Sequence, residues 1–139
     1  PPSPPPPPPP PPRPPPRPAP RVNRGHRSLK AWQQAMELVV SVYASTVGFP
    51  PNEKFGLASQ LQRAAVSVPA NIAEGAARNG TKEFIHFLSI ASGSLSELDT
   101  LLELAEKLGY LKQPNSLKQQ VDDVSGLVMG LTASMRRKL

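Results

Sequence analysis

The chain has 139 residues, 20 prolines, no cysteine and a formal net charge of +6. This length suffices for one domain with one core. The lack of cysteine excludes disulfides, thiolate metal sites and cysteine nucleophiles. No apolar run reaches the ~18 residues of a membrane span, and the N-terminus lacks the apolar core of a signal peptide. We therefore expect a cytoplasmic protein with no membrane association.

The positive charge is concentrated near the N-terminus. Residues 1–30 carry six Lys or Arg and no acidic residue, whereas ten Lys or Arg and ten Asp or Glu follow from residue 31 onward. The folded part is therefore predicted to be neutral overall. A basic surface on it would depend on how its charges are arranged, not on their sum.

Residues 1–27 are expected to form a disordered, extended Pro/Arg-rich arm. Sixteen prolines fall within the first 20 residues, and polyproline II is the regular conformation that such a sequence favours. Two segments match the pattern of Pro-rich ligands that bind aromatic-lined grooves, with Arg reaching an acidic rim. They are Pro8-x-x-Pro11-x-Arg13 and Pro12-x-x-Pro15-x-Arg17. Such matches arise easily in so proline-rich a run, so the alternative is an arm without a role in the domain's function.

The first two helices are predicted over residues 28–47 and 52–75. Ser28 and Asn52 are the expected N-caps, and Gly48 followed by two prolines is the expected stop. Pro69 lacks the N–H of a helix interior, so we expect a kink there, with a full break as the alternative. The apolar stripe of the first helix is Trp32, Met36, Val39, Tyr43 and Thr46. The stripe of the second is Leu57, Leu61, Ala64, Val68 and Ile72.

Two further helices are predicted over residues 81–108, capped by Thr81 and closed by Gly109, and over 115–137. The third has the stripe Phe84, Phe87, Ala91, Leu95, Leu98, Leu102 and Ala105. The fourth has Leu117, Val121, Val124, Val128, Leu131 and Met135. Four amphipathic helices with short connections and no strand-like alternation predict an all-α, antiparallel up-down-up-down four-helix bundle.

Catalytic equipment is not visible in this sequence. Glu83-x-x-His86 fits half of a carboxylate-bridged di-metal site, but such a site needs a second Glu-x-x-His, and the other histidine, His26, lies in the arm. Residues 75–80 lack a phosphate-loop pattern, and no serine has a recognisable partner base. We therefore expect no enzyme activity, metal, cofactor or small-molecule substrate.

A polar series follows the second helix: Gln60, Arg63, Ser67, Asn71, Glu74 and Arg78. One interpretation is an outer face, or a polar seam with Glu97 or Glu103 on the third helix. The functional interpretation is a strip that binds phosphate. Its basic residues would be Arg63, Arg78 and Lys82, together with Arg136, Arg137 and Lys138. The aromatic residues fall on core stripes or near turns, so contacts to the nucleic-acid backbone should dominate over base stacking.

Three segments resemble the 23S rRNA intervening-sequence proteins, a bacterial family of four-helix bundles. They are residues 29–36 (LKAWQQAM), 62–75 (QRAAVSVPANIAEG) and 83–98 (EFIHFLSIASGSLSEL). The resemblance runs from about Leu29 to Leu139 and leaves the arm outside. It implies a ring-like homo-oligomer, a pentamer, with RNA binding as an expectation. A related branch, the accessory proteins of diversity-generating retroelements, associates with reverse transcriptase and nucleic acid.

The sequence departs from that family at three positions. Gln62 stands where the family typically has a second Arg, Ala77 where Gly is common, and Gly80 where Ser is common. The first departure removes a positive charge from the predicted phosphate strip. Three functions follow as hypotheses: an oligomeric module that binds RNA or DNA, a protein-interaction scaffold that uses the Pro-rich arm or a groove, and an enzyme, which no sequence feature supports.

Overall fold

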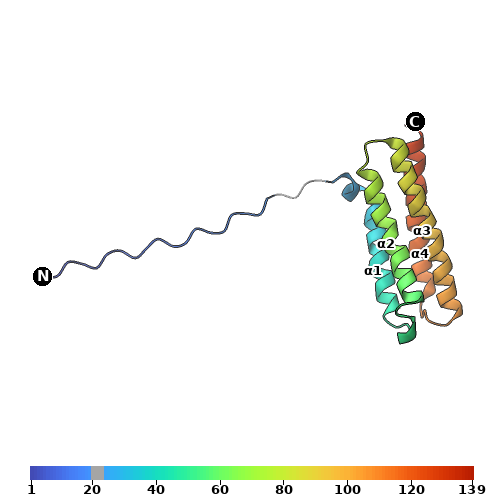
Figure 1. The fold of residues 1–139 in the computed structure, drawn as a ribbon, viewed down its shortest axis with the longest axis horizontal. Helices are drawn as coiled ribbons and strands as arrows, with labels where there is room; N and C mark the ends of the chain where they lie inside the picture. The colour runs from blue at the N-terminus through green and yellow to red at the C-terminus, as the bar shows by residue number, and fades with distance from the viewer. Residues whose placement is uncertain (20–23) are drawn as a thin grey trace.

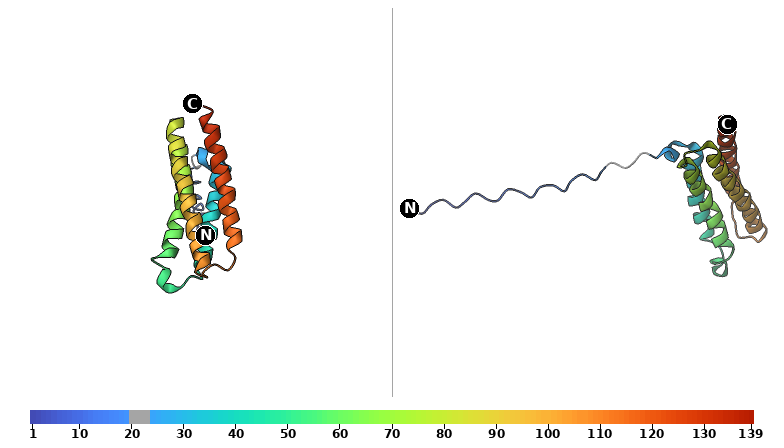
Figure 2. Two further views of the ribbon diagram at one scale, coloured as in Figure 1. Left: turned by 90° about the vertical axis from the view of Figure 1, so that its right-hand side faces the viewer. Right: turned by 45° about the horizontal axis from the view of Figure 1, so that its top comes forward.

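The predicted all-α four-helix bundle is confirmed by the computed structural model, which describes residues 1–19 and 24–139. Residues 20–23, part of the expected arm, lie outside the described residues. Figure 1 shows four helices side by side in alternating directions, and Figure 2 shows the same arrangement from two other sides. The helices are α1 (Lys30–Thr46), α2 (Leu57–Ala76), α3 (Thr81–Lys107) and α4 (Pro114–Arg136), with 3₁₀ turns η1 (Gly25–Ser28) and η2 (Pro51–Glu53).

The three predicted N-caps are wrong. Ser28 lies in η1, where its hydroxyl donates to the Gly25 carbonyl at 3.0 Å, and α1 begins after Leu29. Asn52 lies in η2, so α2 begins five residues later than predicted, at Leu57. Thr81 is already the first helical residue of α3. Each side chain is an intrinsically good cap, but the preceding turn places it outside the capping position.

Hydrogen bonds explain where α2 begins and where α3 ends. The Leu57 N–H, at the start of α2, donates to Oε2 of Glu53 at 3.2 Å. After α3, Gly109 adopts a φ of 77°, and the N–H groups of Gly109 and Tyr110 donate to the carbonyls of Glu106 and Ala105, each at 2.9 Å. This pair of bonds around a left-handed glycine is the Schellman motif that ends helices. Gly109 is therefore the stop predicted from the sequence.

Helix α2 continues through Pro69, so the alternative of a full break there is wrong. Proline in a helix interior removes one hydrogen bond and crowds the preceding turn. Pro69 is itself buried, as are its α2 neighbours Val68 and Ile72.

The predicted α2 stripe is buried throughout. The stripes of α3 and α4 are buried except at the ends that face the basic residues, where Phe84, Phe87, Leu131 and Met135 are half-buried. The α1 stripe is displaced. The side chains that α1 buries are Ala31, Ala35, Leu38, Val42 and Thr46. Met36 is 43% exposed and Tyr43 46% exposed, whereas Trp32 and Val39 are half-buried. Two apolar stripes offset by one residue both satisfy the helical spacing, and the structure selects the one whose alanines allow close packing. Met36 and Tyr43 of the other stripe are therefore exposed, as are the neighbouring Val40 and Val47.

Helices α2 and α3 approach closely near the turn that joins them. A Cβ added to the buried Gly75 would lie 2.8 Å from Cβ of Phe87 and 2.9 Å from Cδ1 of Phe84. Real Cβ atoms do not tolerate such contacts, so a residue without a side chain is required here. Gly75 thereby fixes the packing of both helices directly below the α2–α3 turn.

Candidate nucleic-acid interface

The alternating helix directions bring three separate parts of the chain to one end of the bundle. These parts are η1 with the start of α1, the turn between α2 and α3, and the end of α4 (Figure 1). We call this surface the basic end, because the Lys and Arg residues of all three parts gather there. It carries Arg24, Arg27, Lys30, Arg78, Lys82, Arg136, Arg137 and Lys138.

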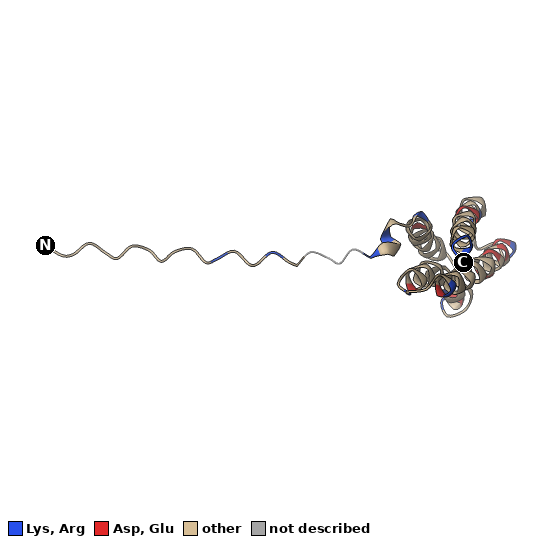
Figure 3. Cartoon of the chain, turned by 90° about the horizontal axis from the view of Figure 1, so that it is seen from above, with Lys and Arg blue, Asp and Glu red and all other residues tan. Residues whose placement is uncertain are grey.

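Charge is separated along the bundle's long axis. The basic end has two acidic residues, Glu74 and Glu83, against its eight cationic ones. The remainder of the bundle has five Lys or Arg and eight Asp or Glu. The view onto the basic end in Figure 3 shows blue segments on η1 and beside the C-terminus. The predicted neutral sum counts from residue 31 and leaves out Arg24, Arg27 and Lys30, which the structure adds to the bundle. The positive excess lies at one end, the arrangement that attracts polyanions.

Five of the six predicted nucleic-acid contacts lie at the basic end, and all five are exposed or half-exposed: Arg78, Lys82, Arg136, Arg137 and Lys138. Arg63 is also exposed but does not join them. It precedes Arg78 by four turns of α2, which is a separation of about 22 Å along the helix axis. Of the predicted strip, Arg63 therefore stands apart, and the other five residues lie together with Arg24, Arg27 and Lys30.

Sequence reasoning missed Arg24, Arg27 and Lys30 as site residues because it assigned the first two to a disordered arm. In the structure the chain is folded from Gly25, as the turn η1, which contacts α1 and α2. A signal was present in the sequence, since these cations directly precede the first predicted helix. Basic residues placed beside a helix start lie at an end of the bundle, where the α2–α3 turn also falls.

Trp32 anchors η1 to the bundle. The ring of His26 meets the Trp32 ring edge-on at a centroid distance of 4.9 Å, and Cζ of Arg27 lies 5.5 Å from the Trp32 ring centroid. The Gln33 side-chain amide donates to the Arg27 carbonyl at 2.8 Å. The half-buried Trp32 therefore serves as an attachment point rather than as a platform for a base.

Arg78 is held in place from two sides. Its Nη2 donates to Oε1 of Glu74 at 2.6 Å, and its Cζ lies 5.2 Å from the centroid of the Phe87 ring. Both carboxylate and guanidinium are about half exposed, so the pair adds little stability. It orders a planar group whose remaining N–H donors suit phosphate oxygens.

Glu83 is exposed, and the ring of His86 on the same helix lies edge-on to Phe87 at 5.5 Å. Within residues 1–19 and 24–139, no group of three or more His, Asp or Glu side chains comes together in a geometry that could hold a metal ion. In the same part of the chain no helix is long and apolar enough to cross a membrane.

The polar series of α2 forms a seam with α3, but not with the predicted partners Glu97 or Glu103. Ser67 and Ser94 share a hydrogen bond of 2.8 Å between their hydroxyls, and the Asn71 amide donates to the Ser67 hydroxyl at 2.9 Å. Serine and asparagine are short enough to bond in the narrow space between these helices.

Gln62 does not belong to the basic end. Its amide donates to the Thr46 hydroxyl at 3.0 Å, far down the bundle near the end of α1. A positive charge at position 62 would therefore lie away from the cationic cluster of the basic end.

The described part of the arm, residues 1–19, is exposed and forms neither helix nor strand. The predicted Pro-rich ligand residues lie within it: Pro8, Pro11, Pro12, Arg13, Pro15 and Arg17.

Comparisons with known proteins agree with this architecture. A family described as 23S rRNA-intervening sequence protein matches residues 27–130. Among solved structures, the chain is similar to a protein of unknown function from the S23 ribosomal protein family of Bacteroides thetaiotaomicron, with a TM-score of 0.68 and 22% identity. The match covers 74% of this chain and 95% of that one, and at this identity it shows a shared fold. No curated protein matches the chain.

Proposed function

The chain belongs to the 23S rRNA-intervening sequence protein family, and we propose that it is a non-enzymatic module that binds RNA through the basic end. The supporting observation is the gathering of eight cationic side chains from three separate segments, with two acidic residues among them. Binding of this kind releases counterions from the phosphate backbone and depends strongly on salt.

The aromatic residues near the basic end favour contacts to backbone phosphate over contacts to bases. Phe84 and Phe87 pack against Gly75, and Trp32 is covered by His26 and Arg27. Base stacking needs an uncovered ring face. The proposed binding is therefore largely independent of sequence, and the positions of Arg78 and Arg27 set its geometry.

We extend the proposal to a homo-oligomer, the pentamer that the family resemblance implies. An assembly whose basic ends face one RNA would raise the overall affinity without a strong site on each chain. Helix α3 exposes Ile90 and Leu104, and Leu108 follows at its end; a neighbouring copy could cover these apolar side chains. Light scattering of the purified chain should give a mass several times 14.9 kDa, and a monomer at all concentrations would contradict this part of the proposal.

Fluorescence anisotropy with labelled RNA across a salt series tests the binding proposal. The variant Arg136→Gln/Arg137→Gln/Lys138→Gln should bind more weakly and should lower the magnitude of the salt slope by about 0.9 for each phosphate that it no longer neutralises. The matched control Lys54→Gln/Lys107→Gln/Lys112→Gln removes three charges elsewhere on the bundle and should leave both quantities nearly unchanged. Equal losses of affinity in the two variants, or no binding by the full chain at low salt, would refute the basic end as the interface.

A second candidate function rests on the exposed arm. Its two PxxP segments have the form of ligands for a partner protein with an aromatic-lined groove and an acidic rim. A pull-down with the full chain and with a chain lacking residues 1–19 tests this function. The deletion leaves η1 intact, so partners that need the arm should disappear while those that bind the bundle remain.

A further inference from the structure

The Pro-rich arm directly precedes η1 in the chain, so it joins the bundle at the basic end. Trp32 and Gln33 hold η1 in place through their contacts with His26 and Arg27. The described part of the arm, residues 1–19, extends away from the helices (Figure 1). Figure 3 shows blue segments along the arm on the way to η1. The arm therefore starts at the cationic surface and carries further cations outward from it.

The charges of the arm continue those of the basic end. Arg13 and Arg17 are exposed on the arm, and Arg24 and Arg27 are exposed at its junction with the bundle. The sequence has no carboxylate before Glu37. The two ion pairs among the described residues include none of these arginines. Their guanidinium groups therefore lack a carboxylate partner within the described residues and suit an anion from outside the chain.

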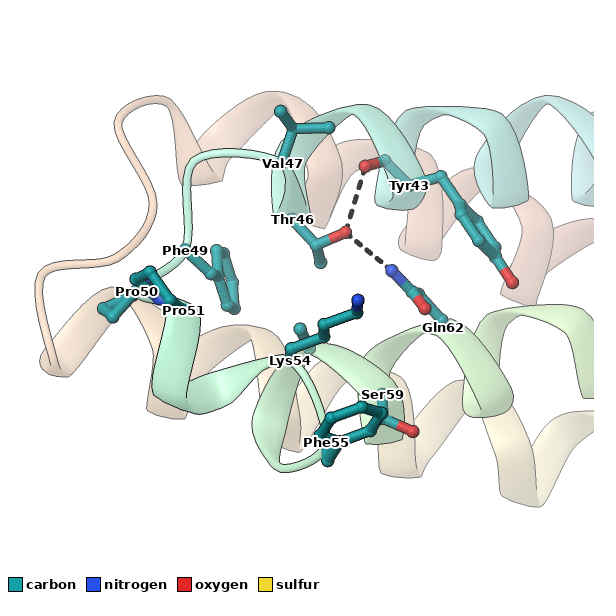
Figure 4. A pocket seen from close by; sticks show the side chains of 11 residues that line it. Tyr43, Thr46, Val47, Phe49, Pro50, Pro51, Lys54, Phe55, Ser59 and Gln62 are labelled. Carbon is teal, nitrogen blue, oxygen red and sulfur yellow. Dashed lines mark hydrogen bonds between the residues drawn. The ribbon is translucent and has the colours of Figure 1, made fainter.

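Neither end of the bundle favours binding of the arm's arginines. The basic end has eight cationic residues against two acidic ones, and one of these two, Glu74, is paired with Arg78. At the opposite end, the groove between the end of α1 and the start of α2 (Figure 4) is lined by Lys54 and, among the described residues, by no carboxylate. Like charges repel the arm from both ends, whereas a polyanion bound to arm and basic end together relieves this repulsion.

Proline gives the arm a form that suits a long polyanion. Polyproline II advances about 3.1 Å per residue, so Arg13 and Arg17 stand about 12 Å apart. Neighbouring phosphates of one strand are separated by about 3.4 Å along a duplex axis, so the two guanidinium groups reach different phosphates. A segment that is already extended loses less conformational entropy on binding than a flexible one. The arm is thus prepared to lie along a phosphate backbone.

We propose that the arm is a second part of the RNA site, in which Arg13 and Arg17 bind phosphates beyond those held by the basic end. This inference rests on the proposed function and adds the kind of ligand, an RNA that continues past the bundle. From Arg24 the chain can hold Arg13 up to about 40 Å away, at about 3.6 Å per residue. Residues 1–19 include no aromatic side chain, so the arm reads no bases and follows the backbone alone.

Anisotropy titrations of the full chain over a salt series, with an RNA duplex of about 30 base pairs, test the proposal. Arg13→Gln/Arg17→Gln should lower the magnitude of the salt slope by about 1.8 for each bound chain, which is about 0.9 for each lost phosphate contact. The fall in affinity between about 50 and 200 mM salt should then be about tenfold smaller than for the parent chain. The matched control Lys54→Gln/Lys107→Gln removes two charges at the opposite end of the bundle and should leave the slope nearly unchanged.

A short RNA separates the arm from the basic end. A hairpin with a stem of about 6 base pairs is at most about 20 Å long, so it can cover the basic end but cannot also follow the arm. Arg13→Gln/Arg17→Gln should therefore change the salt slope of this hairpin much less than that of the long duplex. An equal change on both RNAs would overturn the proposal that arm and basic end bind successive stretches of one RNA.

The remaining outcomes distinguish this proposal from the proposed function. If the substitutions of Arg136, Arg137 and Lys138 lower the slope on the long duplex and Arg13→Gln/Arg17→Gln does not, the basic end stands as the interface and the arm does not belong to it. If the full chain binds neither RNA at low salt, both proposals fail. An unchanged slope together with loss of a protein partner from Arg13→Gln/Arg17→Gln in a pull-down would assign the arm to that protein instead.

Discussion

The two ends of the bundle are both built from helix termini and connections, yet they differ in charge and in apolar exposure. At the basic end the α2–α3 turn is tight, Gly75 lets the helices touch, and the aromatic rings are packed. At the opposite end the α1–α2 connection is longer, and Phe55 and Val47 stand uncovered beside a groove. One end gathers cationic side chains and the other exposes apolar ones.

The comparison shows how topology converts scattered charge into a surface. Arg27, Arg78 and Arg137 lie about 50 or more residues apart in the chain, and antiparallel packing brings their segments together. Reversal of any one helix would place one of these clusters at the other end. A balance of charges from residue 31 onward therefore does not exclude a cationic surface.

The largest change in stability should come from Gly75→Ala. Its new Cβ meets Phe87 and Phe84 at distances that force the helices apart, so we expect a loss of about 1–3 kcal/mol in the free energy of unfolding. Gly126→Ala is the matched control, since a Cβ there meets nothing within 4 Å, and it should stabilise α4 by about 0.4–1 kcal/mol. Urea denaturation measures both. Similar effects of the two substitutions would mean that close approach at Gly75 is not required.

The next largest effect concerns RNA binding, which should be weakened by substitution of Arg78 and not by substitution of Arg63. Arg78→Gln should lower the magnitude of the salt slope by about 0.9, as expected when one phosphate is no longer neutralised, whereas Arg63→Gln should leave it unchanged. Both substitutions remove one charge from an exposed site at or near α2. The two variants have the same net charge, so anisotropy titrations show whether the position of the lost charge matters. A larger effect of Arg63→Gln would contradict the proposed interface.

The smallest effect concerns an ion pair away from the basic end. The hydrogen bond from Lys118 to Glu106 raises the pKa of Lys118, aided by the nearby Glu103 and Asp99 carboxylates. A raised pKa in the folded state stabilises the protein below the ordinary lysine pKa of about 10.4 and ceases to do so as pH rises through the folded value.

Thermal unfolding of the parent chain and of Lys118→Gln over a pH series tests the predicted loss of this stabilisation with rising pH. The parent chain should be slightly more stable at neutral pH, as is typical of exposed ion pairs, and the difference should vanish in the alkaline range. A difference that instead grows with pH would rule out the pair as its source.

Much of the fold could be predicted from hydrophobic spacing. The stripes of α2, α3 and α4 and the stop at Gly109 follow from local pattern and turn chemistry, since each has one apolar face and one conformational option. Helix α1 has two adjacent stripes of similar spacing, and only packing against its neighbours decides between Ala35 and Met36. The N-caps failed for a related reason, because Ser28 and Asn52 fit either a cap or a 3₁₀ turn.

The sequence by itself determined that this protein has four amphipathic helices and a Pro/Arg-rich N-terminal arm, because composition and periodicity are local properties. Tertiary structure decided which α1 face is buried, that Arg63 stands apart from Arg78, and that Arg24, Arg27 and Lys30 join the other cations at one end. These outcomes depend on contacts between segments distant in the chain, which no local pattern contains. Five of the six cations of the predicted strip lie at one end of the bundle, and Arg63 lies away from them.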